Sequence, residues 1–252
     1  MKKLLALVLA LALSLTAVSA LAADYVIGTD NPFKPFEWYN ENGELVGIDI
    51  ELMEAIAADQ GFSVEWQAVG WDSAIAGCQA NQYDGMIAGA SIKQERIDNG
   101  WHFSDGYYTA NQSMAVAADS DIASINDMQG KVVVVKTGTE SATYAASVAE
   151  TYGFTVTTVQ DDATMYQMVM GGQADAVFND TPILNANIAA GVALKVIEDS
   201  ANEGADYGFA IFTAAGEELS ESQQKLMDAF NAGLANVKAN GTYDAILAKY
   251  LN

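Results

Sequence analysis

The feature that most constrains the fold of this chain is an alternation of short apolar runs with longer segments of helical periodicity. In residues 49–56, the clearest helical segment, apolar side chains recur three and four positions apart, as on one face of a helix. Residues 37–47 differ, because two apolar pairs flank a polar turn and predict a hairpin. The short runs predict strands at residues 25–28, 64–67, 86–88, 132–135, 155–159, 176–178, 194–197 and 209–212. Strands separated by helices indicate βαβ units, so we expect an α/β fold with mostly parallel sheets.

The order of these elements predicts two lobes. One α/β series ends near residue 110 and a second near 208, and the chain then finishes in two helical segments, 217–239 and 242–251. These helices have no strand of their own to cover, so we expect them to return to the first lobe. The expected lobes are residues 23–110 with 210–252 and residues 111–209, with crossings near 108–112 and 207–210. Two crossings form a hinge, and a ligand cleft is expected between the lobes.

The first 22 residues predict a signal peptide. Lys2 and Lys3 precede an apolar run at residues 4–18, and Ala20-Leu21-Ala22 provides a small-residue cleavage site. We expect cleavage after Ala22 and export to the periplasm. An uncleaved anchor is the alternative, because the run approaches the ~20 residues that span a bilayer.

Charge and composition exclude several classes of function. The 33 acidic and 11 basic side chains give a net charge of −22, whereas nucleic-acid binding requires clustered Lys and Arg. We therefore expect no nucleic-acid partner. One Cys and one His leave neither a disulfide framework nor a metal site built on several such ligands, and no cofactor is expected.

Arg96 is the only arginine of the chain, so it is the sole planar, five-donor fork for a carboxylate. It follows the predicted strand 86–88 and the turn Gly89-Ala90-Ser91, which places it near the expected cleft. The alternative is a surface ion pair with Glu95 or Asp98.

Two turns in the second lobe complete a candidate site. After the strand 132–135 the chain turns through Gly138 into a helix, whose first N–H groups suit an anion unless they are merely capped. The strand 176–178 leads to Asp180, just before a helix that can start at Pro182. Asp180 can receive an ammonium group; alternatively, Asp180 or Thr181 simply caps that helix. Together with Arg96, Asp180 would hold the two ends of an α-amino acid.

Several segments carry a family resemblance, namely residues 29–37, 46–52, 91–96, 103–108 and 240–243. In them the chain resembles the periplasmic solute-binding proteins of polar amino acid ABC importers, and most closely the glutamine-binding type, over nearly all of residues 24–252. The resemblance implies a type II two-lobed fold that closes on one L-amino acid. It also implies a monomer that delivers this ligand to a membrane permease and catalyses no reaction.

The resemblance assigns the ligand's charged ends. It puts the α-carboxylate on Arg96, assisted by backbone N–H groups at Ser91 and Glu140. It puts the α-ammonium on Asp180, the Gly89 carbonyl and the Ser91 hydroxyl. Opposite charges at the two ends fix the orientation of the ligand in the cleft.

The resemblance also assigns the walls and the side-chain end of the cleft. Phe33 and Trp71 match two aromatic walls around the aliphatic part of the ligand. Asp30 and Lys136 match a charged pair that offers an acceptor and a donor, the complement of a carboxamide. An arginine or lysine ligand would meet Lys136 with a repulsion of about 4 kcal/mol at ~4 Å and an effective dielectric of ~20. Glutamine is therefore favoured.

Two residues depart from the glutamine type. Asn179 replaces a histidine, and Glu140, beside Thr139 in the turn, replaces a glycine. The added charge of Glu140 near the cleft mouth favours a cationic amino acid as the alternative ligand. A cyclohexadienyl dehydratase-like enzyme is the second alternative, with Glu140 as its candidate general acid.

Overall fold

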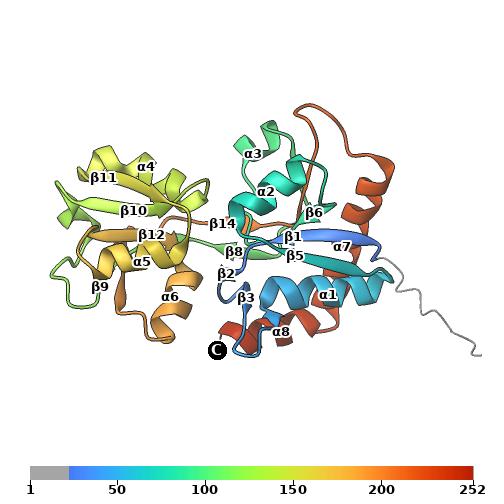
Figure 1. Cartoon of the computed structure of the whole chain (residues 1–252), viewed down its shortest axis with the longest axis horizontal. Coiled ribbons are helices and arrows are strands. Elements are labelled where there is room, and N and C mark those ends of the chain that lie inside the picture. Colours follow the sequence, from blue (N-terminus) through green and yellow to red (C-terminus); the bar gives the residue numbers. More distant parts are fainter. Residues whose placement is uncertain (1–22, 252) are drawn as a thin grey trace, which may run out of the picture.

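The computed structural model describes residues 23–251, and Figure 1 shows them as two lobes joined by a narrow connection. The predicted signal peptide, residues 1–22, lies outside the described residues. Within residues 23–251, no helix combines the length and the apolar character needed to cross a membrane.

The first lobe contains a five-stranded sheet with the order β5-β1-β6-β15-β7. Its strands are β1 (Tyr25–Thr29), β5 (Val64–Ala68), β6 (Gly85–Met86), β7 (Trp101–Phe103) and β15 (Ala210–Phe212). Beside it lies a small antiparallel sheet of β2 (Pro32–Phe33), β3 (Glu37–Tyr39) and β4 (Leu45–Val46). The pairing of β3 with β4 confirms the predicted hairpin.

The second lobe repeats this plan with the sheet order β11-β10-β12-β9-β13. Its strands are β9 (Gln112–Ala117), β10 (Val132–Lys136), β11 (Thr155–Val159), β12 (Ala176–Asp180) and β13 (Leu194–Ile197). Alternate residues of β10 face opposite cores: Val133 and Val135 pack on one side of the sheet and Val134 on the other. Both faces are thus buried, which explains the unbroken run of valines.

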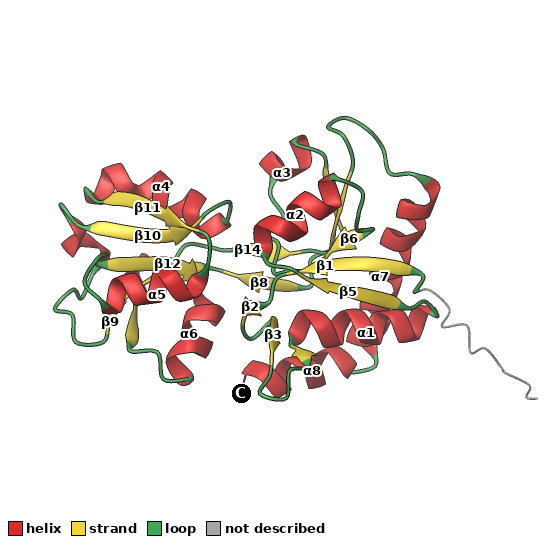
Figure 2. Ribbon diagram, in the orientation of Figure 1, coloured by secondary structure: helices red, strands yellow, loops and turns green. Residues whose placement is uncertain are grey.

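Helices cover both faces of each sheet (Figure 2). In the first lobe these are α1 (Ile48–Gln60), α2 (Trp71–Gln79), α3 (Gln94–Asp98), α7 (Glu221–Ala239) and α8 (Thr242–Leu251). In the second lobe they are α4 (Glu140–Tyr152), α5 (Asp162–Met170) and α6 (Thr181–Ala189), with short 3-10 turns at Ile125–Met128 and Glu198–Ser200.

The connection between the lobes is a two-stranded antiparallel ribbon of β8 (Tyr108–Ala110) and β14 (Ala205–Tyr207). The strand that directly follows each crossing, β9 or β15, runs antiparallel to its neighbours. The other four strands of each sheet share one direction, as expected for βαβ units. The chain lies in the first sheet up to β7, in the second from β9 to β13, and again in the first at β15. The lobe limits 23–110 with 210–252 and 111–209 follow from this path as a proposal, except that Phe209 packs in the core of the first lobe.

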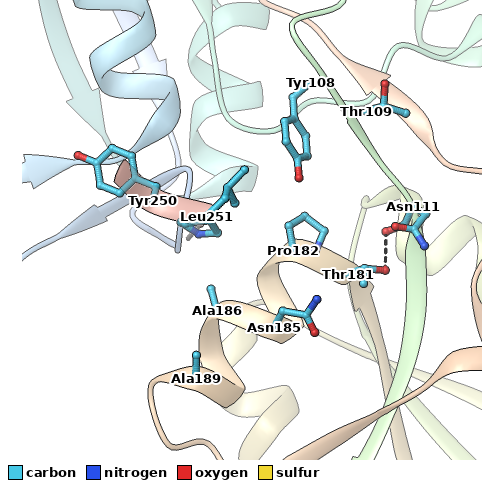
Figure 3. A pocket seen from close by; sticks show the side chains of 11 residues that line it. Tyr108, Thr109, Asn111, Thr181, Pro182, Asn185, Ala186, Ala189, Tyr250 and Leu251 are labelled. Atoms are coloured by element: carbon cyan, nitrogen blue, oxygen red, sulfur yellow. Dashed lines mark hydrogen bonds between the residues drawn. The ribbon is translucent and has the colours of Figure 1, made fainter. Parts of the chain in front are cut away.

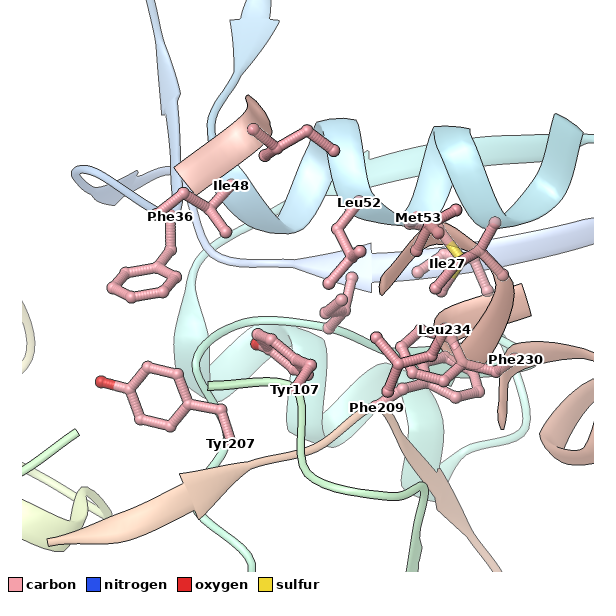
Figure 4. Close-up of a cluster of buried hydrophobic side chains, with 14 of the residues drawn as sticks. Ile27, Phe36, Ile48, Leu52, Met53, Tyr107, Tyr207, Phe209, Phe230 and Leu234 are labelled. Carbon is pink, nitrogen blue, oxygen red and sulfur yellow. The ribbon is translucent and has the colours of Figure 1, made fainter. Parts of the chain in front are cut away.

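The carboxyl-terminal helices pack on the core of the first lobe (Figure 4). Phe230 of α7 stacks on Phe209 at a centroid distance of 4.9 Å, and Leu234 joins the same cluster as Leu52 of α1. The helix predicted from residue 217 begins only at Glu221. Ser220 caps it there, because its side chain and that of Gln223 bond to each other's backbone N–H groups. The strand predicted at 86–88 is likewise shorter, since its ladder covers only Gly85–Met86.

Candidate ligand-binding site

The residues that the sequence singles out meet at one cavity between the lobes. The cavity is lined by Asp30, Phe33, Trp71, Gly89, Ser91 and Arg96 from the first lobe, by Lys136, Thr139, Glu140, Asn179 and Asp180 from the second, and by Ala88. Of these only Ala88 was missed. Its place directly before Gly89, at the end of a predicted strand, was the available signal. The arrangement brings a guanidinium, an ammonium and several carboxylates to the edge where strands of both sheets end.

The cavity is narrow because the lobes are closed on each other. Its volume of about 20 Å³ suits little more than one water molecule. Several polar contacts join the lobes across the cleft, and three of them involve charged side chains: Lys136 Nζ lies 2.5 Å from Asp30 Oδ2, Lys93 Nζ 2.6 Å from Glu140 Oε1, and Arg96 Nη2 donates to Gly138 O at 3.4 Å. An amino acid can therefore enter only when the lobes separate.

Arg96, in α3, is held by carbonyl groups and an aromatic ring. Its Nη1 donates to Ser91 O at 2.8 Å, and its guanidinium carbon lies 5.3 Å from the centre of the Trp71 ring. No ion pair with Glu95 or Asp98 is present among the contacts of the described residues. These contacts use only part of the five-donor fork, so the rest can meet an anion in the cavity.

The turn before α4 places a helix N-terminus beside Arg96. Gly138 adopts φ 72°, a left-handed conformation that suits glycine, and an added Cβ would lie 3.4 Å from Trp71 Nε1. Thr139 is the N-cap, and its hydroxyl accepts from the N–H of Ala142. The N–H groups of Glu140 and its neighbour have no partner within the helix and are available to an anion.

Asp180, at the end of β12, is buried and accepts hydrogen bonds from three side chains. Its Oδ1 accepts from Gln112 Nε2 at 2.7 Å and Ser141 Oγ at 3.2 Å, and its Oδ2 accepts from the Tyr207 hydroxyl. Burial raises the pKa of Asp180, against the lowering effect of these hydrogen bonds. Asp180 occupies the N-cap position of α6, but its side chain makes no capping hydrogen bond there. Sequence reasoning missed Gln112 and Tyr207, whose only signal was their place beside the hinge crossings.

Asp30 and Lys136 form the far end of the cavity. Their side chains are 3% and 5% exposed, and the Lys136 ammonium also lies 5.8 Å from the centre of the Phe33 ring. Although burial lowers the pKa of Lys136, the carboxylates of Asp162 and Asp30 raise it above its ordinary value. Lys136 therefore stays charged when buried.

Asn179 lines the cavity, but its polar atoms are engaged by the protein. Its Nδ2 donates to Asp162 Oδ1 and to the Tyr166 hydroxyl, both at 3.0 Å, and its Oδ1 accepts from the N–H of Asp180 at 2.8 Å. Asn179 thus shapes the wall of the cavity and has no unused donor for a ligand. Asp162 is a buried neighbour that the sequence analysis did not identify.

Glu140 is paired at the mouth of the cleft. Lys93, in the turn before α3, supplies the ammonium group, so the charge of Glu140 is balanced across the lobes. A general acid needs an apolar setting that disfavours its charged form. The ion pair gives Glu140 the opposite surroundings.

Gly89 is fixed from behind by a buried acid. Its φ is 55°, and an added Cβ would lie 2.5 Å from a Phe33 ring carbon, so only glycine fits. The N–H of Gly89 and the Tyr107 hydroxyl both donate to Asp49 Oδ2 at 2.8 Å. Tyr107 directly precedes the hinge strand β8, so Asp49 links the turn at Gly89 to the hinge.

A second buried acid, Glu37, lies beside Asp49, and this pair makes stability depend on pH. Burial, followed by the charge of Asp49, raises the pKa of Glu37 well above its ordinary value. Burial also raises the pKa of Asp49 to about 7, against the lowering effect of its hydrogen bonds from Gly89 and Tyr107. Between the ordinary carboxyl pKa values of the unfolded chain and the raised values of the folded state, the folded state binds more protons than the unfolded state. The free energy of unfolding must therefore fall as pH rises through this interval.

We therefore expect the free energy of unfolding to decrease from pH 5 to pH 8, as measured by urea denaturation. The Glu37→Gln variant removes one of the two charges and should show a shallower decrease. A stability that rises over this interval, or a slope that Glu37→Gln leaves unchanged, would contradict the buried acid pair.

A larger hollow of about 450 Å³ lies elsewhere between the lobes, where α6 faces the end of α8 (Figure 3). Tyr108, Pro182, Asn185 and Tyr250 line it, and no charged side chain does. It therefore lacks the two opposite charges that a zwitterion needs. The described residues also contain no cluster of three or more His, Cys, Asp or Glu side chains suited to a metal ion.

Comparisons with known proteins agree with this geometry. A family model described as bacterial extracellular solute-binding proteins, family 3, matches residues 25–252. The histidine-binding periplasmic protein of Escherichia coli K12 is 29% identical over 259 residues, which cover 100% of this chain and 98% of that protein.

Two solved structures are similar over most of the chain. An ancestral arginine-binding protein bound to arginine is 31% identical, covers 90% of this chain and 98% of its own, and has a TM-score of 0.79; a structure described as the glutamine-bound form also scores 0.79. The second substrate-binding domain of Lactococcus lactis GlnP, in its open conformation, is 36% identical and has a TM-score of 0.60. The match covers 90% of this chain and 94% of that domain. These likenesses confirm the two-lobed periplasmic binding protein fold. The better superposition on the ligand-bound protein, despite its lower identity, agrees with closed lobes.

Proposed function

Because the chain belongs to family 3 of the bacterial extracellular solute-binding proteins, we propose that it is the exported binding component of an ABC importer for a polar L-amino acid. It would be secreted through the predicted signal peptide, hold its ligand between the lobes, and deliver it to a membrane permease. The observation that carries this proposal is the placing of Arg96 and Asp180, which come from different lobes, on the wall of one cavity.

The two charges explain both binding and closure. Arg96 and the N-terminus of α4 would hold the α-carboxylate, and Asp180 would hold the α-ammonium. A ligand that contacts both lobes binds the closed form more tightly than the open one, so it shifts the equilibrium towards closure. The ribbon of β8 and β14 is the hinge for this movement.

For the ligand's side chain we propose a carboxamide, as in glutamine. Asp30 offers an acceptor and Lys136 a donor at the far end of the cavity, and a carboxamide complements both. Support for this choice comes from the GlnP domain and from the glutamine-bound ancestral protein. The relatives named for histidine and arginine support a cationic side chain instead.

We propose binding without catalysis. The one candidate for a general acid, Glu140, is engaged by Lys93, and the remaining acids of the cavity are held by protein donors. The enzyme alternative, a cyclohexadienyl dehydratase-like protein, would convert cyclic acids, so we expect incubation with such acids, followed by chromatography, to show no product.

A thermal-shift panel of the twenty amino acids tests the proposed function. A ligand at 100 times its dissociation constant adds about 2.7 kcal/mol to stability, which raises the Tm of a protein of this size by about 5–10 °C. We expect such a rise with glutamine, a rise also with L-arginine as the cationic alternative, and smaller ones with the remaining polar L-amino acids. D-glutamine is the matched control, and a panel in which no amino acid raises Tm would contradict the proposal.

A further inference from the structure

We infer that Asp162 is the residue that allows the cleft to accept a cationic side chain, and that it sets the preference between a guanidinium or ammonium group and a carboxamide. This inference rests on the proposed function and assigns the side-chain class of the same site. Asp162 does not line the cavity and would not touch the ligand. It would act indirectly, by attracting Lys136 and by adding a negative charge near the ligand's side chain.

The contacts of Asp162 leave one of its oxygens without a donor. Its side chain, at the start of α5, is 4% exposed, and Oδ1 accepts from Asn179 Nδ2 at 3.0 Å. Oδ2 has no hydrogen-bond partner among the described residues and lies 3.8 Å from Lys136 Nζ. Asp30 Oδ2 lies 2.5 Å from the same ammonium nitrogen. Lys136 thus sits near two carboxylates, one from each lobe.

The charges of this cluster do not balance. Two carboxylates and one ammonium leave a net charge of −1 in a place that is shielded from water, where such an imbalance is costly. A carboxamide ligand would leave the imbalance, whereas a guanidinium or ammonium side chain would cancel it. Without Asp162 the remaining pair of Asp30 and Lys136 would be neutral and would offer a cationic ligand no net attraction. Asp162 therefore shifts the preference towards a cationic ligand, against the donor and acceptor of Lys136 and Asp30 that complement a carboxamide.

Asp162 also gives Lys136 a second place to bind. Lys136 and Asp162 belong to the second sheet and its helices, whereas Asp30 follows β1 of the first. When the lobes separate, Asp30 moves away and Asp162 remains. Because Asp162 Oδ2 lies only 3.8 Å from Lys136 Nζ, a small turn of the lysine side chain would allow a hydrogen bond to form and would free Asp30 for the cationic end of a ligand.

Calorimetric titrations with L-arginine and L-glutamine at pH 7.5 test this assignment. The wild-type protein should bind both. In Asp162→Asn, arginine should lose at least about ten-fold in affinity relative to glutamine, because the net charge of the cluster rises to zero. Asp121→Asn, which removes an exposed acid of the same lobe, is the control and should leave the ratio unchanged.

The pH dependence of the ratio separates this role from a structural one. Burial raises the pKa of Asp162 to about 6, against Lys136, and the other groups that face it are Asp30, Asn179, Tyr166 and Asp180. The arginine-to-glutamine affinity ratio of the wild type should therefore fall below about pH 6, and that of Asp162→Asn should stay flat. Protonation of Asp180 affects both ligands alike and cancels in the ratio. The pH dependence of the wild-type ratio tests the inference even if Asp162→Asn does not fold.

Three results would overturn the inference while the proposed function stands: a wild type that binds glutamine and no arginine, a ratio unchanged in Asp162→Asn, or a wild-type ratio that is flat from pH 5 to pH 8. If the wild type binds no amino acid at all, the proposed function fails and the inference fails with it.

Discussion

The Arg96→Ala variant should bind its amino acid at least about 30-fold more weakly than the wild type in isothermal titration calorimetry. Truncating one partner of a buried charge pair costs about 2 to 5 kcal/mol, and 2 kcal/mol corresponds to a factor of about 30. Arg96 is the only arginine, and its fork is already aligned by Ser91 O and the Trp71 ring. The affinity of Arg96→Lys should lie between those of the wild type and Arg96→Ala, because lysine keeps the positive charge and loses the planar fork.

A ligand analogue sharpens this test. In the α-amide of the ligand, an uncharged amide group replaces the α-carboxylate. The wild type should therefore bind this analogue weakly, and Arg96→Ala should lower its affinity little further. Lys225→Ala removes an exposed positive charge from α7 and should leave the affinity unchanged. An Arg96→Ala protein that binds the amino acid as well as the wild type does would show that Arg96 is not the carboxylate group.

The Asp180→Asn variant should lose amino acid binding by at least a similar factor while it keeps its fold. The substitution removes the counter-charge of the ammonium group but preserves the shape of the side chain. The amide oxygen can still accept from Gln112 and Ser141, and the amide NH₂ can donate to the hydroxyl of Tyr207. Circular dichroism and the Tm of the unliganded variant check the fold.

The pH dependence of binding provides a second measurement on Asp180. Because burial raises its pKa, acid protonates Asp180 and removes its charge, so wild-type affinity should fall as pH is lowered. The ligand's N-acetyl derivative, which carries no ammonium, should bind weakly to the wild type and to Asp180→Asn alike. An affinity that Asp180→Asn leaves unchanged would contradict the assignment.

The positions of Arg96 and Asp180 could be predicted because both follow apolar strands at points where the chain turns into a helix. In an α/β protein such points gather at one edge of each sheet, and two sheets joined by a hinge bring two such edges together. The placing of α7 and α8 on the first lobe was predictable for a related reason. Their apolar faces needed a sheet that the chain after residue 212 does not supply.

The contacts that tune the site could not be predicted in this way. Asp180 accepts from Gln112 and Tyr207, which are 68 and 27 residues away in sequence. The antiparallel pairing of β9 with β12 places Gln112 opposite Asp180, whereas Tyr207 belongs to β14 of the hinge ribbon. Asp162 lies at a helix start that resembles an ordinary cap, and only the tertiary structure places it beside Lys136. The sequence alone therefore predicts one carboxylate, Asp30, at the far end of the cleft, whereas Asp30 and Asp162 both lie near Lys136 there.

The central claim is that Arg96 and Asp180, from different lobes, bind the two charged ends of one amino acid. A crystal structure of the protein with the amino acid that most raises its Tm is the most direct test of this claim. We predict the α-carboxylate oxygens within about 2.7–3.2 Å of the Arg96 guanidinium, and the α-nitrogen within the same range of an Asp180 oxygen. A ligand bound in the hollow between α6 and α8, or in the cleft with its charged ends away from these two side chains, would contradict this claim.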